Sequence, residues 1–324
     1  MNSISNYKEI IATHINNLEI DKKPNELYDP IRYILSLGGK QLRPVLTLFS
    51  SEIFGSTHQQ AVHAATAIEL FHNFSLIHDD IMDDAPLRRG NATVHEKWNI
   101  NTGILSGDAM LILAYQYFEN YESDIFKELA QLFSKTALEV CEGQQLDINF
   151  ETRNDVTVQE YIKMIEYKTA VLVGAALQMG AIVAKTSPEN KKAIYDFGLN
   201  LGIAFQLQDD YLDAFGDSAT FGKQIGGDIL ENKKTYLYLL ALENANDEDK
   251  KSLKSWFSTT ENNGIEKIKE VKIIFEKTKA TKATQLQIEE YTNKALEILE
   301  LLQIDENHKN ELRTFALNLM NRSV

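Results

Sequence analysis

Apolar residues recur along the chain at intervals of three and four positions, which is the period of an amphipathic α-helix. Ile31, Ile34 and Leu35 show this spacing near the N-terminus, and Leu299 and Leu302 show it near the C-terminus. Alternating runs of β-branched and polar residues, which would indicate half-buried strands, do not stand out. The pattern predicts a chain that is helical almost throughout.

The chain has only five prolines and none after Pro188, so its second half can form long uninterrupted helices. A glycine-rich break lies between residues 215 and 228, but the apolar pattern resumes directly after it. We therefore predict one all-α domain over residues 1–324, with a charged, solvated periphery near 244–282. The main helices are expected near 58–84, 124–148, 157–184 and 189–214.

The longest apolar stretch, residues 170–184, is shorter than the roughly 20 residues that span a bilayer. We expect it to form a helix buried on all sides, and we expect no integral membrane segment. The N-terminus lacks the apolar core of a secretory signal. Cys141 is the single cysteine, so no intramolecular disulfide can form. We expect it to be buried, in a cytoplasmic protein.

Acidic residues outnumber basic ones by 47 to 33, which gives the 324-residue chain a net charge of −14. General binding to nucleic acid needs the opposite sign, so we expect no nucleic-acid partner. Local basic residues or bound cations must therefore attract any anionic ligand.

Aspartates occur in two dense clusters, 79-DDIMD-83 and, 130 positions further on, 209-DDYLD-213. In each cluster the first and fifth residues lie on one face of a helix. A solvated acidic surface is the ordinary explanation of such a run. Apolar residues such as Ile77 and Leu207 surround these clusters, however, so we expect the aspartates to line an internal cavity.

Carboxylates gathered in a cavity need counter-charge. Two of them about 6 Å apart repel by roughly 3 kcal/mol at an effective dielectric constant of about 20. Oxygen ligands select a hard divalent cation, and Mg²⁺ commonly binds through one or two carboxylates together with substrate phosphates. The two clusters therefore predict a site where cations bind a diphosphate.

Basic residues accompany the clusters. Arg88 and Arg89 directly follow the first one, and guanidinium groups match phosphate oxygens in a bidentate manner. Each basic residue alone would be an ordinary surface charge, but as a set in an acidic protein they favour phosphate binding. The others are Lys40 and Arg43 in 38-GGKQLRP-44, Lys168, Lys223 in 222-GKQIGGD-228, Lys233 and Lys234.

These motifs resemble those of the trans-prenyl diphosphate synthases, which include farnesyl, geranylgeranyl and longer polyprenyl synthases. Both clusters match the DDxxD motif of that family, and 38-GGKQLRP-44, RRG at 88–90, KT at 168–169 and FQxxDD at 205–210 follow in family order. The resemblance implies an all-α, multi-helix bundle of the isoprenoid synthase type around a central cavity. It also implies a homodimer that uses two or three Mg²⁺ ions.

The resemblance further implies that the enzyme joins isopentenyl diphosphate head to tail to an allylic diphosphate, and it assigns roles to residues. Mg²⁺ ligands would be Asp79, Asp83 and Asp209, supported by Asp80 and Asp213. Contacts to the allylic diphosphate would come from Arg88, Lys168 and Lys223. The diphosphate of isopentenyl diphosphate would bind Lys40, Arg43, His72 and Arg89. Thr169 and Gln206 would lie near the reacting carbons, while Gln144 and Asp147 resemble cavity-lining residues without a direct role. Residues 214–234 are the candidate for a segment that closes over the site.

Product length depends, in this family, on residues before the first DDxxD motif. Phe74 lies five positions before Asp79, about 7–8 Å along the helix, and Ser75 follows it. A bulky residue here resembles a floor that stops elongation, and this arrangement is most similar to enzymes that make geranylgeranyl diphosphate. Farnesyl diphosphate is the alternative product, and an ordinary core aromatic is the alternative interpretation of Phe74.

A terpene cyclase and a non-catalytic subunit are the alternative functions. A terpene cyclase would resemble a chain with one DDxxD motif and a different second metal motif, whereas this chain has two DDxxD motifs. A non-catalytic subunit of a heteromeric synthase would be expected to lack an aspartate or lysine of the set, and all are present.

Overall fold

The computed structural model describes residues 4–216, 225–258 and 264–320, without the side chains of Ile4 and Ser5. Over these ranges the chain is helical apart from its turns and one short antiparallel hairpin, so the predicted all-α class is confirmed. The predicted central cavity stays a prediction.

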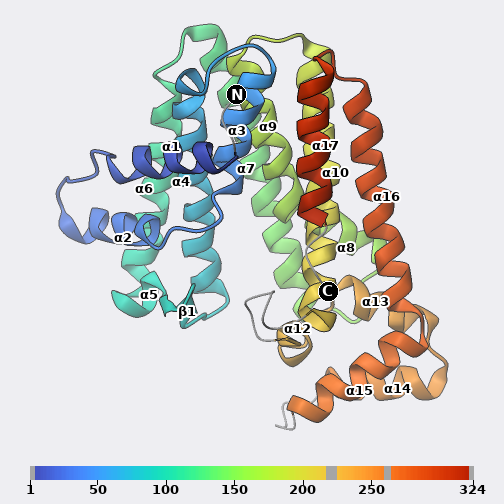
Figure 1. Ribbon diagram of the computed structural model, residues 1–324. Coiled ribbons are helices and arrows are strands. Elements are labelled where there is room, and N and C mark those ends of the chain that lie inside the picture. The colour runs from blue at the N-terminus through green and yellow to red at the C-terminus, as the bar shows by residue number, and fades with distance from the viewer. Residues whose placement is uncertain (1–3, 217–224, 259–263, 321–324) are drawn as a thin grey trace. The chain divides into compact units, whose positions relative to one another are not determined.

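The helices and strands follow one another closely along the chain (Figure 1). The first half contains α1 (Ile4–Asn16), α2 (Asn25–Ser36), α3 (Leu42–Ile53), α4 (His58–Met82), β1 (Leu87–Arg88), β2 (Asn91–Ala92), α5 (Val94–Lys97), α6 (Ile100–Phe118) and α7 (Ser123–Thr152). The second half contains α8 (Val158–Ile165), the π-helix η1 (Glu166–Ala170), α9 (Val171–Val183), α10 (Pro188–Phe215), α12 (Gly227–Leu230), α13 (Tyr236–Asn244), α14 (Asp247–Trp256), α15 (Gly264–Lys277), α16 (Ala280–Glu300) and α17 (Glu306–Met320).

The chain forms two compact units, each discontinuous in sequence. Unit 1 contains residues 1–135 and 175–192, and unit 2 contains residues 136–174 and 193–324. Helices α7, α9 and α10 each contribute residues to both. Each unit is described by itself below, and a single domain over residues 1–324 stays a prediction.

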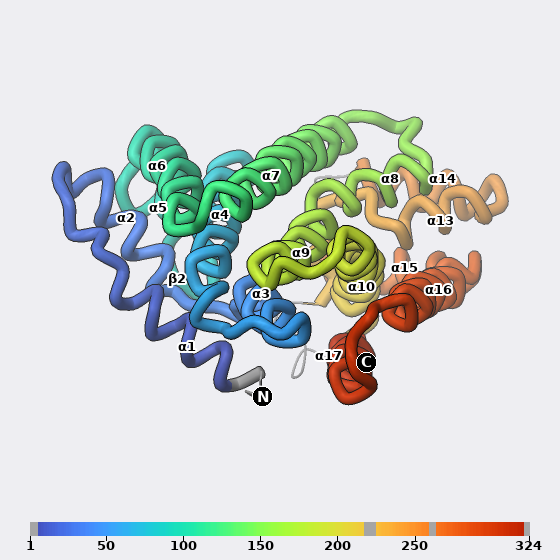
Figure 2. Tube along the Cα trace, turned by 90° about the horizontal axis from the view of Figure 1, so that it is seen from above, coloured from blue at the N-terminus to red at the C-terminus, as the bar shows by residue number. Residues whose placement is uncertain are grey.

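In unit 1, α4 packs between α3 and α6 (Figure 2). Two glycines of α6, one helical turn apart, permit the close approach of α4. A Cβ atom at Gly107 would lie 2.3 Å from Nε2 of His78, and one at Gly103 would lie 2.8 Å from Cδ1 of Ile81. Such distances are far below van der Waals contact, so larger side chains would push α6 away from the part of α4 that leads into the first aspartate cluster.

Unit 2 has its own apolar core, to which α8, α10, α13, α15 and α16 contribute. Figure 1 shows α16 and α17 side by side along this unit. The predicted charged periphery corresponds to α14 and α15, but each of these helices also buries apolar residues against the core. Leu253, Val271 and Phe275 are all at most 1% exposed.

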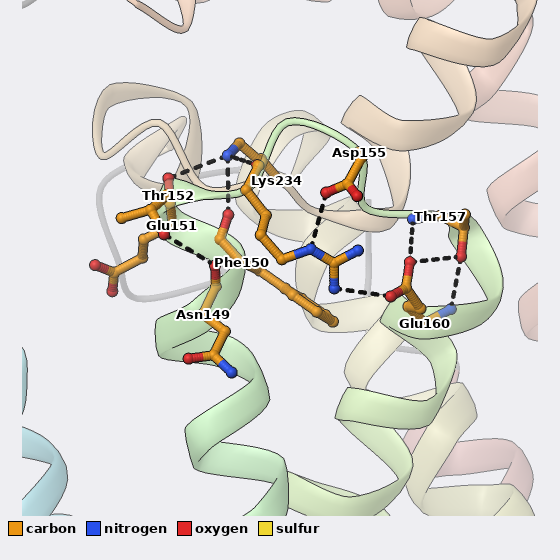
Figure 3. Close-up of polar contacts among 9 residues, drawn as sticks. Asn149, Phe150, Glu151, Thr152, Asp155, Thr157, Glu160 and Lys234 are labelled. Carbon is orange, nitrogen blue, oxygen red and sulfur yellow. Dashed lines mark hydrogen bonds and ion pairs between the residues drawn. The ribbon is translucent and has the colours of Figure 1, made fainter.

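Lys234, one of the candidate phosphate-binding residues, instead caps the end of α7 (Figure 3). Its ammonium group donates hydrogen bonds to the carbonyl oxygens of Phe150 at 2.9 Å, Glu151 at 3.1 Å and Arg153. The last carbonyls of a helix have no partner within the helix and carry its negative dipole end, so a cation stabilises them. Lys234 is thus used to join the segment after residue 225 to the end of α7.

The apolar stretch at 170–184 forms α9, whose residues are almost all buried, as predicted. No helix in the described part of the chain combines the length and the apolar character needed to cross a membrane. The prediction for Cys141 was wrong, because its side chain is exposed on α7. Helical periodicity places Cys141 next to buried Val140 but on the outer face of the helix.

Candidate active site

The first aspartate cluster lies at the C-terminal end of α4, in unit 1. Asp79 is partly exposed, Asp80 is buried at 1% exposure, and Asp83 is exposed where the helix ends. The amide of Asp83 donates to the carbonyl of Asp79 at 2.8 Å, so the helical geometry of the pair is kept to the last residue. The carboxylates of this cluster therefore differ in exposure, from buried Asp80 to exposed Asp83, and are not uniformly solvated.

Asp80 binds Arg88 through three hydrogen bonds. Nε of Arg88 lies 2.9 and 2.8 Å from the two carboxylate oxygens, and Nη2 lies 2.6 Å from Oδ1. A bidentate pair of this kind fixes the direction of the guanidinium group. Asp80 therefore orients Arg88, while its role as a supporting metal ligand stays a prediction.

Behind this pair, Arg43 and His72 meet inside unit 1, with Nη1 of Arg43 lying 3.2 Å from Nε2 of His72. Burial lowers the pKa of His72 well below its ordinary value, and the positive charges of three arginines lower it further. These are Arg43, Arg89 and Arg88. The imidazole is therefore neutral at pH 7 and lies in a strongly positive environment.

Glu69 is an acidic residue that lies among these basic side chains. The sequence did not predict it as part of the site. Glu69 is 4% exposed, and this burial raises its pKa. A hydrogen bond from Asn73 at 3.1 Å and the charges of Arg43 and Arg89 lower the pKa, but burial is the larger effect. Burial also lowers the pKa of Arg43, whose Nε has no hydrogen-bond partner within the described residues. Two carboxylates, Glu69 and Asp80, lie among three arginines, which leaves positive charge that an anion could neutralise.

Lys40 is exposed in the loop before α3, and the backbone of that loop lies against Arg89. A Cβ atom at Gly39 would lie 2.6 Å from Nη2 of Arg89. Gly39 of the GGK motif therefore makes room for a guanidinium group. The four residues predicted to bind one diphosphate, Lys40, Arg43, His72 and Arg89, all belong to unit 1.

The second aspartate cluster lies near the end of α10, in unit 2. Asp209 is partly exposed, whereas Asp210 and Asp213 are buried at 5% and 9% exposure. Oδ2 of Asp213 accepts a hydrogen bond from the amide of Asp228 at 3.0 Å. Asp213 thus holds the start of α12 as well as contributing to the cluster.

A hydrogen-bond chain connects the cluster to the residues expected near the reacting carbons. Thr169 donates to Oε1 of Gln206 at 3.2 Å, and Nε2 of Gln206 donates to Oδ1 of Asp210 at 3.0 Å. Tyr161 donates to the other oxygen of Asp210 at 2.5 Å. The chain fixes which end of the Gln206 amide points to Thr169.

The pKa of Asp210 is raised to about 8, chiefly by burial and also by the nearby charges of Asp228 and Asp209. The hydrogen bonds from Tyr161 and Gln206 act in the opposite direction but do not compensate. Asp210 therefore keeps its proton at neutral pH when no metal is bound. Neither Tyr161 nor Asp228 was assigned to the site from the sequence. The only signal was that 226-GGD-228 follows a cluster rich in aspartate.

Lys168 and Thr169 lie on the π-helix η1, an irregularity of a kind frequent at functional sites. Two glycines from other helices hold it closely. A Cβ atom at Gly143 of α7 would lie 2.3 Å from the backbone nitrogen of Lys168, and one at Gly202 of α10 would lie 2.7 Å from Cα of Ala170. The side chain of Lys168 forms an ion pair with Asp147, so Asp147 orients a residue of the site.

The remaining predicted residues are Phe74, Ser75 and Lys223. Phe74 is 9% exposed on α4 and lies against Phe71 and His78, with ring centroids 5.5 and 4.7 Å away. Ser75 donates to the carbonyl of His72 at 2.8 Å. Lys223 lies outside the described residues, as does most of the glycine-rich part of the 214–234 segment.

The raised pKa of Asp210 predicts how stability changes with pH in the absence of metal. In the unfolded chain an aspartate ionises near pH 3.8, while in the folded protein Asp210 keeps its proton until about pH 8. The folded state therefore binds more protons than the unfolded state between these values, and the free energy of unfolding falls as pH rises through this window.

Thermal unfolding in EDTA at pH 5, 6.5 and 8 measures this effect. Asp210→Asn is expected to show a weaker fall across the series than the wild type and a midpoint higher by a few degrees at pH 8. Asp108→Asn, which changes an exposed aspartate of α6, is the control and should follow the wild type. Parallel curves for Asp210→Asn and the wild type would contradict the assignment.

The chain is similar to known proteins over most of its length. The polyprenyl synthetase family model matches residues 24–275. A short chain isoprenyl diphosphate synthase of Methanothermobacter thermautotrophicus is 39% identical over 305 residues, which cover 94% of this chain and 93% of that protein. The geranylgeranyl diphosphate synthase of Methanosarcina mazei is 40% identical over 245 residues, covering 75% of this chain and 76% of that protein.

Solved structures are similar over the whole length. One geranylgeranyl pyrophosphate synthase is 54% identical, with a TM-score of 0.95 and complete coverage of both chains. A geranylgeranyl pyrophosphate synthetase of Pyrococcus horikoshii is 34% identical, with a TM-score of 0.92 and coverage of 99% of this chain and 98% of that one. Two DDxxD clusters, each with its own buried partners, thus occur on a fold shared along the full chain, and the chain belongs to the polyprenyl synthetase family.

Proposed function

We propose that this member of the family is a short-chain trans-prenyltransferase. It joins isopentenyl diphosphate head to tail to an allylic diphosphate, and its product is geranylgeranyl diphosphate. The names of the similar proteins support this substrate class and product. The observation that carries the proposal is the basic group beside the first DDxxD motif, in which three arginines lie near His72 and Nε of Arg43 has no partner within the described residues.

The diphosphate of isopentenyl diphosphate is proposed to bind Lys40, Arg43, His72 and Arg89. Arg43 supports this assignment because its Nε is shielded from water and has no hydrogen-bond partner within the described residues. A buried guanidinium group without full hydrogen bonding costs free energy, which a phosphate oxygen would recover. Neutral His72 can donate its remaining ring proton to the same anion, since its Nε2 faces Arg43.

The donor sets fit Mg²⁺. Asp79, Asp83 and Asp209 would hold two or three ions, supported by Asp80 and Asp213. The acidic surroundings of Asp210 support this fit, because a divalent cation stabilises carboxylates that lie close together. When bound, Mg²⁺ neutralises the charge that develops on a departing diphosphate.

The allylic diphosphate is proposed to bind Arg88, Lys168 and Lys223. Arg88 and Lys168 are each oriented by an aspartate, Asp80 and Asp147 respectively. Their positive charges favour breakage of the allylic C–O bond, since they stabilise the leaving group. Oxygen atoms of Thr169 and Gln206 would then stabilise the allylic cation. The double bond of isopentenyl diphosphate attacks C1, and the departed diphosphate takes the proton that is lost.

We further propose a homodimer and a cytoplasmic location. A homodimer is supported by α6, where Ile104, Leu105 and Ile112 expose 40%, 59% and 59% of their surface. Apolar residues this exposed on one helix are typical of a surface that a partner covers, and sedimentation velocity would test the dimer.

A cytoplasmic location stays a prediction from the single cysteine, and cell fractionation would test it.

Incubation of the purified protein with Mg²⁺, isopentenyl diphosphate and each allylic primer tests the function. Linear diphosphates with geranylgeranyl diphosphate as the main species are expected. Farnesyl diphosphate as the main product would correct the product but keep the reaction. Cyclic hydrocarbons would indicate a cyclase, and no turnover with any primer would support a non-catalytic subunit.

Loss of a metal-binding carboxylate should remove activity without unfolding the protein. Asp79→Asn and Asp209→Asn are each expected to lower kcat by roughly 100–1,000-fold or more, because the leaving group loses charge stabilisation. Circular dichroism should remain that of the wild type. Asp108→Asn is the control, since its exposed carboxylate lies outside the clusters. Normal turnover by a folded Asp79→Asn protein would refute the metal assignment.

Phe74→Ala is expected to lengthen the products beyond geranylgeranyl diphosphate, because it would remove the proposed floor. Phe71→Ala is a matched control, since it truncates the neighbouring buried ring of the same helix. Both changes should destabilise the fold by about 3–5 kcal/mol, so stability alone cannot explain a difference between them. Thin-layer or mass-spectrometric sizing of the products measures the effect, and identical profiles would exclude Phe74 from length control.

Gly143→Ala tests whether the π-helix positions Lys168 and Thr169. The added methyl group would meet the backbone of Lys168, so η1 must shift. A displacement of about 1 Å can lower turnover by roughly 100-fold. Glu142→Ala changes an exposed neighbour on α7 and should retain activity. Wild-type kinetics for Gly143→Ala would show that the close packing has no catalytic role.

A further inference from the structure

Three metal-ligating side chains meet beside the first aspartate cluster. One ligand atom from each of Asp84, His95 and Glu96 lies within 4.8 Å of the others. Within the residues that the structure describes, no other group of three histidine, cysteine or acidic side chains meets this distance. None of the three belongs to the proposed diphosphate-binding or Mg²⁺-binding residues.

The hairpin explains why residues 84 and 95 meet. Its strands pair Leu87 with Ala92 and Arg88 with Asn91, around a turn at residues 89–90 in which both φ angles are positive. The same register continued outward sets position 84 opposite position 95. Two hydrogen bonds close the neck of the hairpin, from the Thr93 hydroxyl to the Ala85 carbonyl at 2.8 Å and from the Thr93 amide to the Pro86 carbonyl at 3.2 Å.

His95 supplies an observation that acidic residues alone would not. Its side chain is 4% exposed, and neither ring nitrogen has a hydrogen-bond partner within the described residues. Its Nε2 lies 3.8 Å from Oε1 of Glu96, too far for a hydrogen bond. Buried imidazole nitrogens nearly always have a partner, so two without one indicate a missing ligand.

We propose that Asp84, His95 and Glu96 bind a Zn²⁺ ion. One imidazole nitrogen and two carboxylate oxygens are a suitable set for zinc, with water as the fourth ligand. Ligand atoms around tetrahedral zinc are about 3.3 Å apart, so contraction from the observed spacing requires only side-chain rotation. Asp84 and Glu96 are exposed and give the ion a path from solvent.

An ion at this site would join the two ends of the hairpin. Asp84 precedes β1, and His95 and Glu96 follow β2, so the metal would close the loop that carries Arg88 and Arg89. This site differs from the proposed Mg²⁺ site in its ligands, because it contains an imidazole and the proposed Mg²⁺ ligands are all aspartates. Its existence does not depend on the proposed prenyl transfer.

The test is equilibrium dialysis of the tag-free, full-length protein against Zn²⁺ in millimolar Mg²⁺, which occupies the aspartate clusters. Wild-type protein is expected to retain one zinc per chain. Glu96→Gln and Asp84→Asn change exposed residues and should fold normally, and asparagine tolerates the positive φ at position 84. Each should weaken zinc binding by more than the roughly 10–100-fold that loss of an outer-shell partner costs.

His308→Gln is the matched control, because His308 pairs with Asp305 at 2.8 Å but belongs to no group of three. It should keep the wild-type stoichiometry. A second measurement follows the imidazole nitrogens by ¹⁵N NMR, where zinc should shift the His95 resonances and not those of His308. Equal zinc binding by wild type and Glu96→Gln, or an unmoved His95 resonance, would overturn the proposal.

Discussion

Charge held out of water is the constraint on which the structure of both units depends. Asp80 is almost fully buried and is tolerated because Arg88 covers it with three hydrogen bonds. Arg43 is half-buried beside a neutral histidine, with one carboxylate near it. Each unit therefore carries charge that its own side chains balance only in part. Burying an unbalanced charge is costly, so such positions are occupied where a ligand completes the balance.

The groups around His72 in unit 1 are mainly basic and those around Asp210 in unit 2 are mainly acidic, which suits the binding of diphosphates and of cations. In unit 1, arginines outnumber the acidic groups around His72, whereas in unit 2 aspartates surround Asp210. A basic group attracts a phosphate directly, and an acidic group attracts it through bound metal. A chain with an overall charge of −14 can bind anionic substrates in this way because the local charges decide the interaction.

Close backbone approach is the second recurring feature. Gly107 admits His78 between α4 and α6, Gly39 admits Arg89, and Gly143 admits the π-helix that carries Lys168. In each place a methyl group would displace a side chain or a backbone segment next to a proposed ligand. Glycine at these positions costs conformational entropy on folding, but it allows the close packing that positions the functional groups. Site geometry in this protein is thus set by packing between helices as well as by the motifs themselves.

The sequence by itself determined the helical class, the main helices and the family. Three- and four-residue periodicity is local, and the DDxxD, GGK and RRG motifs are contiguous, so both are legible without coordinates. Only the tertiary structure decided that Cys141 is exposed, that Lys234 caps α7, and that Tyr161 binds Asp210. These outcomes depend on the rotation of a helix about its axis and on contacts between residues tens of positions apart. Local sequence patterns predict neither the rotation of a helix nor its long-range contacts, because the packing of the whole core determines them.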